Sequence, residues 1–570
     1  MAKKSEKKEA PKTEQNNNTS KSKKKTIIIA AVAALVVVAI ASVIFINAMP
    51  KGVKVAVSNL PESLNPAIPQ NTQDLNAIEL VFDGLCNNEV IEDEDGNGSL
   101  VAELCLAENI EEVGDDKKTF LVTLNTSTEW HDSKQGETHY LSSEDVVYSF
   151  DVYASKENES PNREYFLSFI DKYEAQDESS VIITFKKPIP LFRVYSVLAS
   201  FKIIPHKYKG KIMDVNMREG ETERSFATAP IGTGPFKFSE WKIERYIAFD
   251  KNSKYENFTN KRVEADTIVI EQIVDPEVRL NELRKGNINL VLETNPLDRQ
   301  KVLSFEGEGV YISSYMPYAF YDLQINTTLF PKVEGRQAIA MALNKKELIP
   351  GITDQEGVVV INSGIFPANT LLKNVPDYYD SEMPAKLPYN ITKAKKLAST
   401  GGIAGQNAML KYPESMGAFG KQLADAIAKQ LEEIGLNVEV KKVNVDTFKR
   451  DVSKEKKNFE LALMYHDGFD NWYSSIGSLY KTNGADNVSG ISDKKLNGLF
   501  ESFDKQNETR GMIDIIDSLE TRFSEQCPAV NLLTLQKDVY ARGLKNVVIA
   551  SDNPFLSAEK WVFGDKTKAK

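Results

Sequence analysis

Two periodicities of apolar residues alternate along most of the chain. Residues 53–57 (VKVAV), 120–124 and 181–185 follow the pattern of β-strands. Residues 75–85 instead place apolar side chains three and four positions apart, as the buried face of a helix does. Residues 276–286 begin with proline and end with glycine, which are typical first and last signals of a helix. Strands that alternate with helices predict α/β domains with mixed sheets.

The second half of the chain continues this alternation with longer helices. Amphipathic helices are predicted over 335–349, 393–400 and 419–435, and strands over 436–443 and 459–465. The pattern contains no internal repeat and no long linker, so we expect a compact body of two or three lobes.

The most apolar stretch lies near the N-terminus. Thr26–Ile46 is 21 residues long and carries no charge, which is enough to span a bilayer as a helix. Lysines immediately before it place the N-terminus in the cytoplasm and the rest of the chain outside the cell. We predict a disordered basic tail over 1–25, a membrane anchor over 26–47 and an extracellular body. The alternative is a signal peptide cleaved after Ala48, which would release a secreted protein.

The distribution of charge argues against one class of partner. The net charge of the chain is −11, but residues 1–25 contribute +6, so the remainder carries −17. Nucleic acid is bound by clustered Lys and Arg, which an acidic body of this kind lacks. We therefore expect no nucleic-acid partner.

The cysteines are too few for a disulfide-stabilised scaffold. Cys86, Cys105 and Cys527 are the three in the chain, and none forms a CxxC pair. We expect them to be small buried residues. A Cys86–Cys105 bridge stays open as an alternative.

The sequence lacks the arrangements that catalysis requires. Its four histidines are scattered, and neither an HExxH zinc motif nor a GxSxG nucleophile turn occurs. Gly420-Lys421 resembles the end of a phosphate-binding loop, but Gln422 stands where Ser or Thr would bind magnesium. We therefore expect no enzyme, no metal and no cofactor.

One glycine-rich stretch needs a separate explanation. Residues 231–241 (IGTGPFKFSEW) begin like a dinucleotide-binding loop, yet Pro235 follows the second glycine and an alternating, strand-like run comes next. A phosphate-binding loop would open into a helix, whose free amides hold the phosphate. We therefore predict a tight turn that leads into a strand.

The same stretch, followed by AFDKNSKYEN, resembles the signature of the extracellular solute-binding proteins of ABC importers, family 5. This group includes oligopeptide- and dipeptide-binding proteins. Further matching segments occur in the family's order over most of the body, among them SLNPAI…IELVFDGL, TEWHDSKQGETHYLSSEDVVYSFDVY, YDLQINTT…GRQAIAMALNKKELI and GKQLADAIAKQLEEIGLNVEV.

The resemblance implies a periplasmic-binding-protein-like fold of type II (cluster C). In that fold two α/β lobes with mixed sheets flank a ligand cleft, an extra lobe is present, and closure traps the ligand. The expected lobes take their residues from several parts of the chain: lobe I from 51–87, 201–322 and 528–565, lobe II from 88–200, and lobe III from 323–527.

The resemblance also indicates where a ligand would bind. In peptide-binding relatives an aspartate after the strand that matches residues 459–465 holds the ligand's ammonium group, because a buried charge needs a partner. Here that segment is YHDGFDNWYSS; Asp470 is the first candidate and Asp467 the second, with His466, Gly468, Phe469 and Trp472 beside them. Aromatic residues suit a cleft that accepts varied ligands; the candidates are Tyr315, Tyr318, Phe320 and Tyr321. The alternatives are a loop carboxylate without a ligand and aromatic rings that pack in the core.

The implied function is capture of oligopeptides or dipeptides outside the cell and their delivery to the permease subunits of an ABC importer, by a monomer without cofactors. The same fold would also suit nickel or a metal chelate, an oligosaccharide, or haem. A sensory receptor is a further alternative. His466 next to Asp467 is the sequence feature that points toward a metal.

Overall fold

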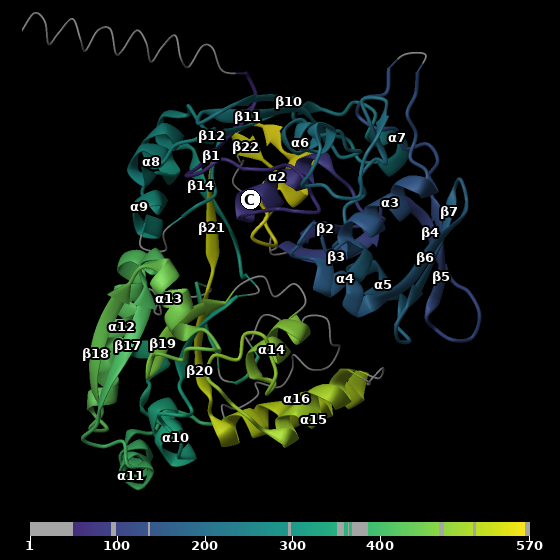
Figure 1. The fold of residues 1–570 in the computed structure, drawn as a ribbon. Coiled ribbons are helices and arrows are strands. Elements are labelled where there is room, and N and C mark those ends of the chain that lie inside the picture. Colours follow the sequence, from purple (N-terminus) through teal and green to yellow (C-terminus); the bar gives the residue numbers. More distant parts are fainter. Residues whose placement is uncertain are drawn as a thin grey trace, which may run out of the picture. The chain divides into compact units, whose positions relative to one another are not determined.

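The structure is a computed structural model of the chain. It describes residues 50–92, 98–134, 137–294, 298–317, 319–349, 358–362, 364–366, 386–466, 472–504 and 509–564. The chain divides into two compact units, residues 1–52 and 53–570, and the second unit holds the strands and helices shown in Figure 1. None of the helices in the described ranges is long and apolar enough to cross a membrane, and the predicted anchor, residues 26–47, lies outside those ranges.

A seven-stranded mixed sheet gathers strands from both ends of the body. Its order is β10-β11-β12-β1-β13-β21-β14, and β1 lies parallel to both β12 and β13. The strands are β1 (Val53–Val57), β10 (Phe236–Lys242), β11 (Tyr246–Lys251), β12 (Thr267–Gln272), β13 (Leu290–Val291), β14 (Val310–Tyr315) and β21 (Lys537–Arg542). The helices of these chain segments are α2 (Thr72–Val81), α6 (Glu221–Thr228), α7 (Glu256–Thr259), α8 (Pro276–Lys285), α9 (Arg299–Leu303) and two 3₁₀ helices, η2 (Glu306–Glu308) and η7 (Pro554–Lys560). A short pair, β22 (Leu544–Lys545) and β23 (Val562–Phe563), follows near the C-terminus.

An antiparallel sheet is inserted between β1 and β10 along the chain. Its order is β4-β5-β7-β6, and it shares one continuous hydrophobic core with the seven-stranded sheet. The strands are β4 (Ala107–Glu112), β5 (Thr119–Leu124), β6 (Ile170–Asp177) and β7 (Ser180–Phe185). The hairpins are β2 (Cys86–Glu92) with β3 (Gly98–Leu104), and β8 (Lys207–Tyr208) with β9 (Lys211–Ile212). The helices are α3 (Ser143–Ala154), α4 (Arg163–Phe169) and α5 (Leu191–Leu198).

A six-stranded mixed sheet forms the remaining part of the body. Its order is β16-β20-β15-β19-β17-β18, and different core clusters cover its two faces because side chains alternate along each strand. The strands are β15 (Phe320–Ile325), β16 (Val359–Ile361), β17 (Asn407–Pro413), β18 (Asn437–Val443), β19 (Leu461–His466) and β20 (Ala529–Leu535). One cluster includes residues of α10 (Val333–Ala342), α11 (Ile391–Gly401) and α12 (Gly417–Glu432), and the other includes residues of α14 (Trp472–Tyr480), α15 (Lys494–Asp504) and α16 (Thr509–Gln526). The remaining elements are α13 (Val445–Val452) and the 3₁₀ helices η3 (Lys345–Glu347) and η5 (Glu414–Met416).

The chain crosses between the two large sheets twice. One crossing joins β14 to β15, and in the other Gln536 alone joins β20 to β21, so that these two strands follow each other nearly end to end in Figure 1. The predicted first lobe included residues 320–322 and 529–535, but these belong to β15 and β20 and pair within the six-stranded sheet. The family pattern gives the order of segments, whereas strand pairing decides the sheet to which a residue belongs. The division into three lobes stays a prediction.

The glycine-rich stretch forms the predicted turn before β10. A side chain at Gly232 would place its Cβ 1.9 Å from the backbone oxygen of Val81, so the turn needs glycine because of close backbone approach. His131 contacts the turn with both ring nitrogens. Its Nε2 lies 3.0 Å from the Gly234 oxygen, and its Nδ1 accepts a hydrogen bond from the Gly232 N–H. Burial lowers the pKa of His131 to about 3, so the imidazole is neutral, as this donor and acceptor arrangement requires.

A group of buried charged side chains joins α2, β2 and η7. Lys202 Nζ lies 2.6 Å from Glu79 Oε2, and Lys261 forms an ion pair with Glu89. Glu559 is only 6% exposed, and its Oε1 has no hydrogen-bond partner among the residues that the structure describes. Burial, and secondarily the charge of Glu89, raises the pKa of Glu559 to about 7.

All three cysteines are buried free thiols, as expected from their small number. Cys86 and Cys105 lie on β2 and beside β3, and the Cys105 sulfur accepts a hydrogen bond of 3.3 Å from Asn87 Nδ2. The alternative of a Cys86–Cys105 bridge is not realised in this structure.

Candidate ligand-binding site

The residues predicted to bind ligand fall into two groups. Asp467, Gly468, Phe469, Asp470 and Tyr318 lie outside the described residues, and of Trp472 only its backbone place, the start of α14, is described. Their role in binding stays a prediction. Tyr315, Phe320, Tyr321 and His466 are described, and all four lie at or next to the crossing from β14 to β15.

The pairing of β15 with β19 brings three of the predicted residues together. Phe320 lies opposite His466, and Tyr321 lies opposite Tyr465. Because neighbouring residues of a strand point to opposite faces, the two pairs serve different faces of the six-stranded sheet. Along the sequence these aromatic residues form one set, and the strand pairing separates them.

The face of the six-stranded sheet that carries Phe320 and His466 is buried. Phe320 has no exposed surface and packs in the core cluster formed with α14, α15 and α16, and its ring centroid lies 5.0 Å from that of His466. This packing agrees with the alternative that the sequence analysis left open for the aromatic set, and it gives Phe320 a structural role.

A buried carboxylate lies directly behind His466. Asp322, two residues after Phe320, has no exposed surface, and its Oδ1 lies 3.1 Å from His466 Nε2. Its Oδ2 accepts hydrogen bonds from Gln324 Nε2 at 2.5 Å and from the Tyr480 hydroxyl at 3.4 Å. Burial, and secondarily the Asp322 charge, raises the pKa of Tyr480 well above its usual value, so its hydroxyl stays a donor. The sequence signal for Asp322 is that it is the single charged residue within the strand FYDLQI, and Asp322 was not among the predicted site residues.

The opposite face of the sheet, which carries Tyr321 and Tyr465, leaves part of its aromatic surface accessible to solvent. The rings of Tyr321 and Tyr465 are both partly exposed, and their centroids are 4.8 Å apart. Phe419, in α12, packs against the Tyr321 ring at 5.1 Å. Lys537 places its ammonium 5.4 Å from the centroid of the Tyr465 ring, within the range of a cation–π interaction. Lys537 is the first residue of β21, so this contact joins the two large sheets.

Tyr315 belongs to the seven-stranded sheet and lies next to Lys537. It ends β14, lies opposite Lys537 in the ladder and is 7% exposed. Its hydroxyl donates a hydrogen bond to Asp552 Oδ1, and Lys537 Nζ lies 2.6 Å from the same oxygen. The crossing therefore carries an exposed aromatic surface with one cation and one anion beside it. Sequence reasoning missed Lys537 and Asp552, since single charged residues in an acidic, lysine-rich chain carry no recognisable pattern.

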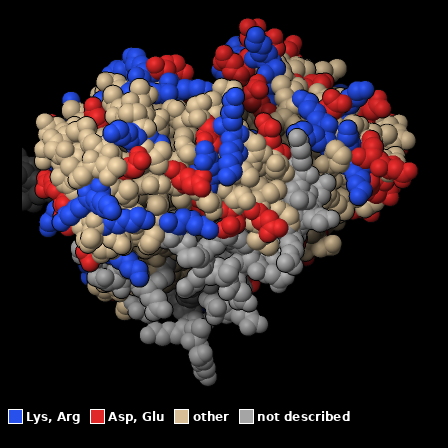
Figure 2. Space-filling model, turned by 90° about the horizontal axis from the view of Figure 1, so that it is seen from below, with Lys and Arg blue, Asp and Glu red and all other residues tan. Residues whose placement is uncertain are grey.

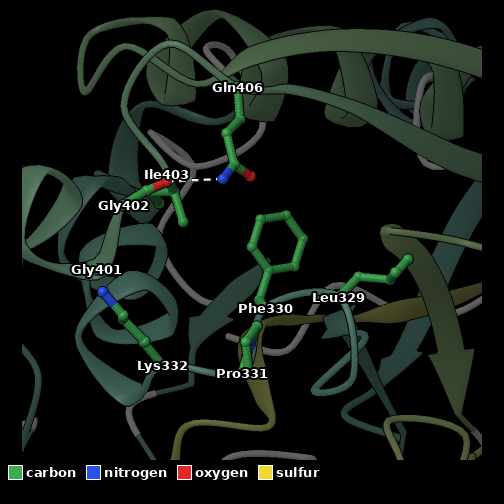
Figure 3. Close-up of a pocket in the computed structure, with 8 residues that line it drawn as sticks. All are labelled: Leu329, Phe330, Pro331, Lys332, Gly401, Gly402, Ile403 and Gln406. Atoms are coloured by element: carbon green, nitrogen blue, oxygen red, sulfur yellow. Dashed lines mark hydrogen bonds between the residues drawn. The ribbon is translucent and has the colours of Figure 1, made fainter.

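A cavity lined by described residues lies away from this surface. It has a volume of about 330 Å³, and Figure 3 shows the Phe330 ring among the lining residues and Gln406 donating a hydrogen bond of 2.7 Å to the Gly402 oxygen. The lining residues are Leu329, Phe330, Pro331, Lys332, Gly401, Gly402, Ile403 and Gln406. No predicted ligand residue is among them. The described residues also contain no group of three His, Cys, Asp or Glu side chains that could hold a metal ion.

The surface charge of the body is mixed. On the face drawn in Figure 2, Lys and Arg side chains are interspersed with Asp and Glu side chains.

Comparison with known proteins places this architecture in a family. Residues 102–487 match the family model described as "Bacterial extracellular solute-binding proteins, family 5 Middle". The oligopeptide-binding protein AppA of Bacillus subtilis is 25% identical over 394 residues, which cover 66% of this chain and 68% of the relative. The heme-binding protein A of Haemophilus influenzae is 25% identical over 321 residues, which cover 54% of each chain. The chain thus matches between about half and two thirds of the length of these relatives.

Solved structures show the same fold over nearly the whole length. The structure of AppA from Bacillus subtilis in complex with a nonapeptide superposes with a TM-score of 0.67 at 19% identity, covering 90% of this chain and 100% of that one. NikZ from Campylobacter jejuni in complex with Ni(L-His) gives a TM-score of 0.69 at 21% identity, with the same coverage. The chain belongs to family 5 of the bacterial extracellular solute-binding proteins of ABC importers, and it is a binding protein rather than an enzyme.

Proposed function

We propose that this protein captures short peptides outside the cell and delivers them to the permease of an ABC importer. The observation that carries the proposal is the side-chain chemistry at the crossing between the two large sheets. Partly exposed aromatic rings of the six-stranded sheet meet there with the ion pair of Lys537 and Asp552, and peptides offer apolar side chains and charged termini to such a surface. Relatives whose names state oligopeptide or dipeptide binding support the same class of ligand.

In this proposal the ligand's ammonium group is held by Asp470, with Asp467 as the second candidate. Tyr315, Tyr318, Tyr321, His466, Gly468, Phe469 and Trp472 would contribute contacts around it. We further propose that the protein acts as a monomer, and that residues 26–47 anchor it in the cell membrane with residues 1–25 in the cytoplasm.

The nature of the ligand is tested by native mass spectrometry of the protein purified without refolding. We expect bound species spread over peptide masses that disappear on partial denaturation. One sharp adduct with the mass of a metal chelate, sugar or haem would keep the fold and replace the peptide with another solute.

The ammonium anchor is tested by Asp470→Asn with calorimetry. Peptides with a free amine should lose at least about tenfold in affinity, because a charged hydrogen bond is lost, whereas N-acetylated peptides should be unaffected. Asp467→Asn tests the second candidate in the same way, and a selective loss of free-amine peptides in that variant alone would move the anchor to Asp467. Equal losses for free and acetylated peptides would remove Asp470 from this role.

Nickel bound as a chelate is the second candidate ligand. NikZ in complex with Ni(L-His) shares the fold, and His466 lies at the crossing beside a buried carboxylate. Binding of nickel with free histidine, in the absence of peptide binding, would favour this candidate.

A further inference from the structure

Lys537 lies where candidate residues of the two large sheets, Tyr315 and Tyr321, come near each other. Tyr315 donates to Asp552, Asp552 binds Lys537, and Lys537 lies over the Tyr465 ring. Tyr465 in turn packs against Tyr321 and precedes His466 in β19. Asp552 and the Tyr465 ring, which belong to different parts of the fold, thus contact one ammonium group.

The Lys537 ammonium retains capacity for a further partner. A lysine ammonium has three N–H donors, and Asp552 is its only hydrogen-bond acceptor among the described residues. The Tyr465 ring attracts the positive charge without offering a lone pair of a carbonyl or carboxylate. The Lys537 side chain is 36% exposed, so a solute on the crossing can reach a remaining donor.

The ion pair with Asp552 positions Lys537 more than it stabilises the fold. Both side chains are about one-third exposed, at 36% and 34%, and ion pairs of that exposure contribute little to folding stability. The pair does hold the ammonium against the aromatic surface. Asp538, the next residue, pairs with Arg299 and so does not compete for Lys537.

We propose that Lys537 binds a carboxylate of the ligand, which makes it a determinant of specificity for anionic groups. The inference rests on the proposed peptide function. It assigns the negative end of the peptide to the crossing strand β21, whereas the predicted ammonium anchor follows β19. The carboxylate is either the C-terminus of the peptide or an acidic side chain, and the experiment separates these two sources.

The experiment uses three probes: trialanine, trialanine amide, and the amide of Ala-Glu-Ala. Calorimetry compares the wild-type protein with Lys537→Met, Lys537→Arg and the control Lys209→Met, which removes a lysine 4.7 Å from the Tyr208 ring outside the crossing. The wild type and the control should bind trialanine at least about tenfold more tightly than its amide, a difference of about 1.4 kcal/mol. Lys537→Met should abolish this preference, and Lys537→Arg should retain most of it.

Several results would decide the matter. A preference of the wild type for Ala-Glu-Ala amide over trialanine amide, lost in Lys537→Met, identifies an acidic side chain as the source. A preference for free carboxylate that survives in Lys537→Met overturns the proposal, as does equal binding of all three probes by the wild type. Failure of the wild type to bind any of these peptides would remove the proposed peptide function, and this inference with it. Thermal denaturation of each variant checks that a lost preference does not come from a lost fold.

Discussion

Replacing the buried Glu559 with glutamine should change stability in a way that depends on pH. The carboxylate is 6% exposed, and its Oε1 lacks a hydrogen-bond partner among the described residues, with the Lys560 ammonium 3.9 Å away. Its pKa in the folded protein is about 7, above its value of 4.5 in the unfolded chain. The folded state therefore binds the proton more tightly than the unfolded state. The contribution of Glu559 to the free energy of unfolding of the wild type falls as the pH rises from about 4.5 to about 7.

The size of the effect follows from the shift. A rise from 4.5 to about 7 corresponds to about 3 kcal/mol, at about 1.4 kcal/mol for each pH unit. Glutamine stays neutral, so the stability of Glu559→Gln relative to wild type should increase by about this amount between pH 4 and pH 8. The constant cost of burying the new amide cancels in this comparison, because it is the same at both pH values.

Chemical denaturation of both proteins at several pH values gives this difference directly. The same substitution at the exposed Glu432 of α12, Glu432→Gln, is the matched comparison for a glutamate outside a buried site. A flat difference for Glu559→Gln would refute the assignment of a buried, uncompensated carboxylate at this position.

Two further changes probe packing and charge elsewhere. Gly232→Ala should prevent normal folding or cost more than about 3 kcal/mol, because its Cβ would lie 1.9 Å from a backbone oxygen, whereas Gly307→Ala, which has open space, should fold normally; soluble yield and thermal denaturation compare the two. Lys411→Met should destabilise the protein by about 3 kcal/mol in denaturant, because it removes the ammonium 2.8 Å from Asp451 Oδ2 and leaves that buried carboxylate only the Arg450 guanidinium, 3.8 Å away. Adding Asp451→Asn should restore much of that loss, and a double variant as unstable as the single one would contradict this explanation.

The secondary structure followed from local patterns more readily than the sheets did. The runs at 53–57, 120–124 and 181–185 are strands β1, β5 and β7, and the proline-to-glycine segment 276–286 is helix α8 with its cap. Each of these depends on periodicity and end signals within a few residues. In contrast, β13 consists of Leu290 and Val291 alone, and its partners come from β1 and β21, far away in the sequence.

The candidate site shows the same limit. An aromatic cluster was recognisable, but its division between two faces depends on the register of β15 against β19, which no local pattern specifies. Phe320 is therefore in the core, whereas Tyr321 retains exposed surface. Lys537 and Asp552 became candidates only through the fold, since 15 residues of sequence separate two side chains that meet at 2.6 Å.

The two crossings also have a consequence for the order of biosynthesis. β21 pairs with β13 and β14, and β20 pairs with β15 and β16, so each large sheet is completed by a strand made after residue 528. Contacts this distant in sequence make folding slow, because long loops close before the contacts form. During export from the N-terminus, both sheets therefore lack one strand. Neither sheet can form completely until the last 42 residues are available for pairing.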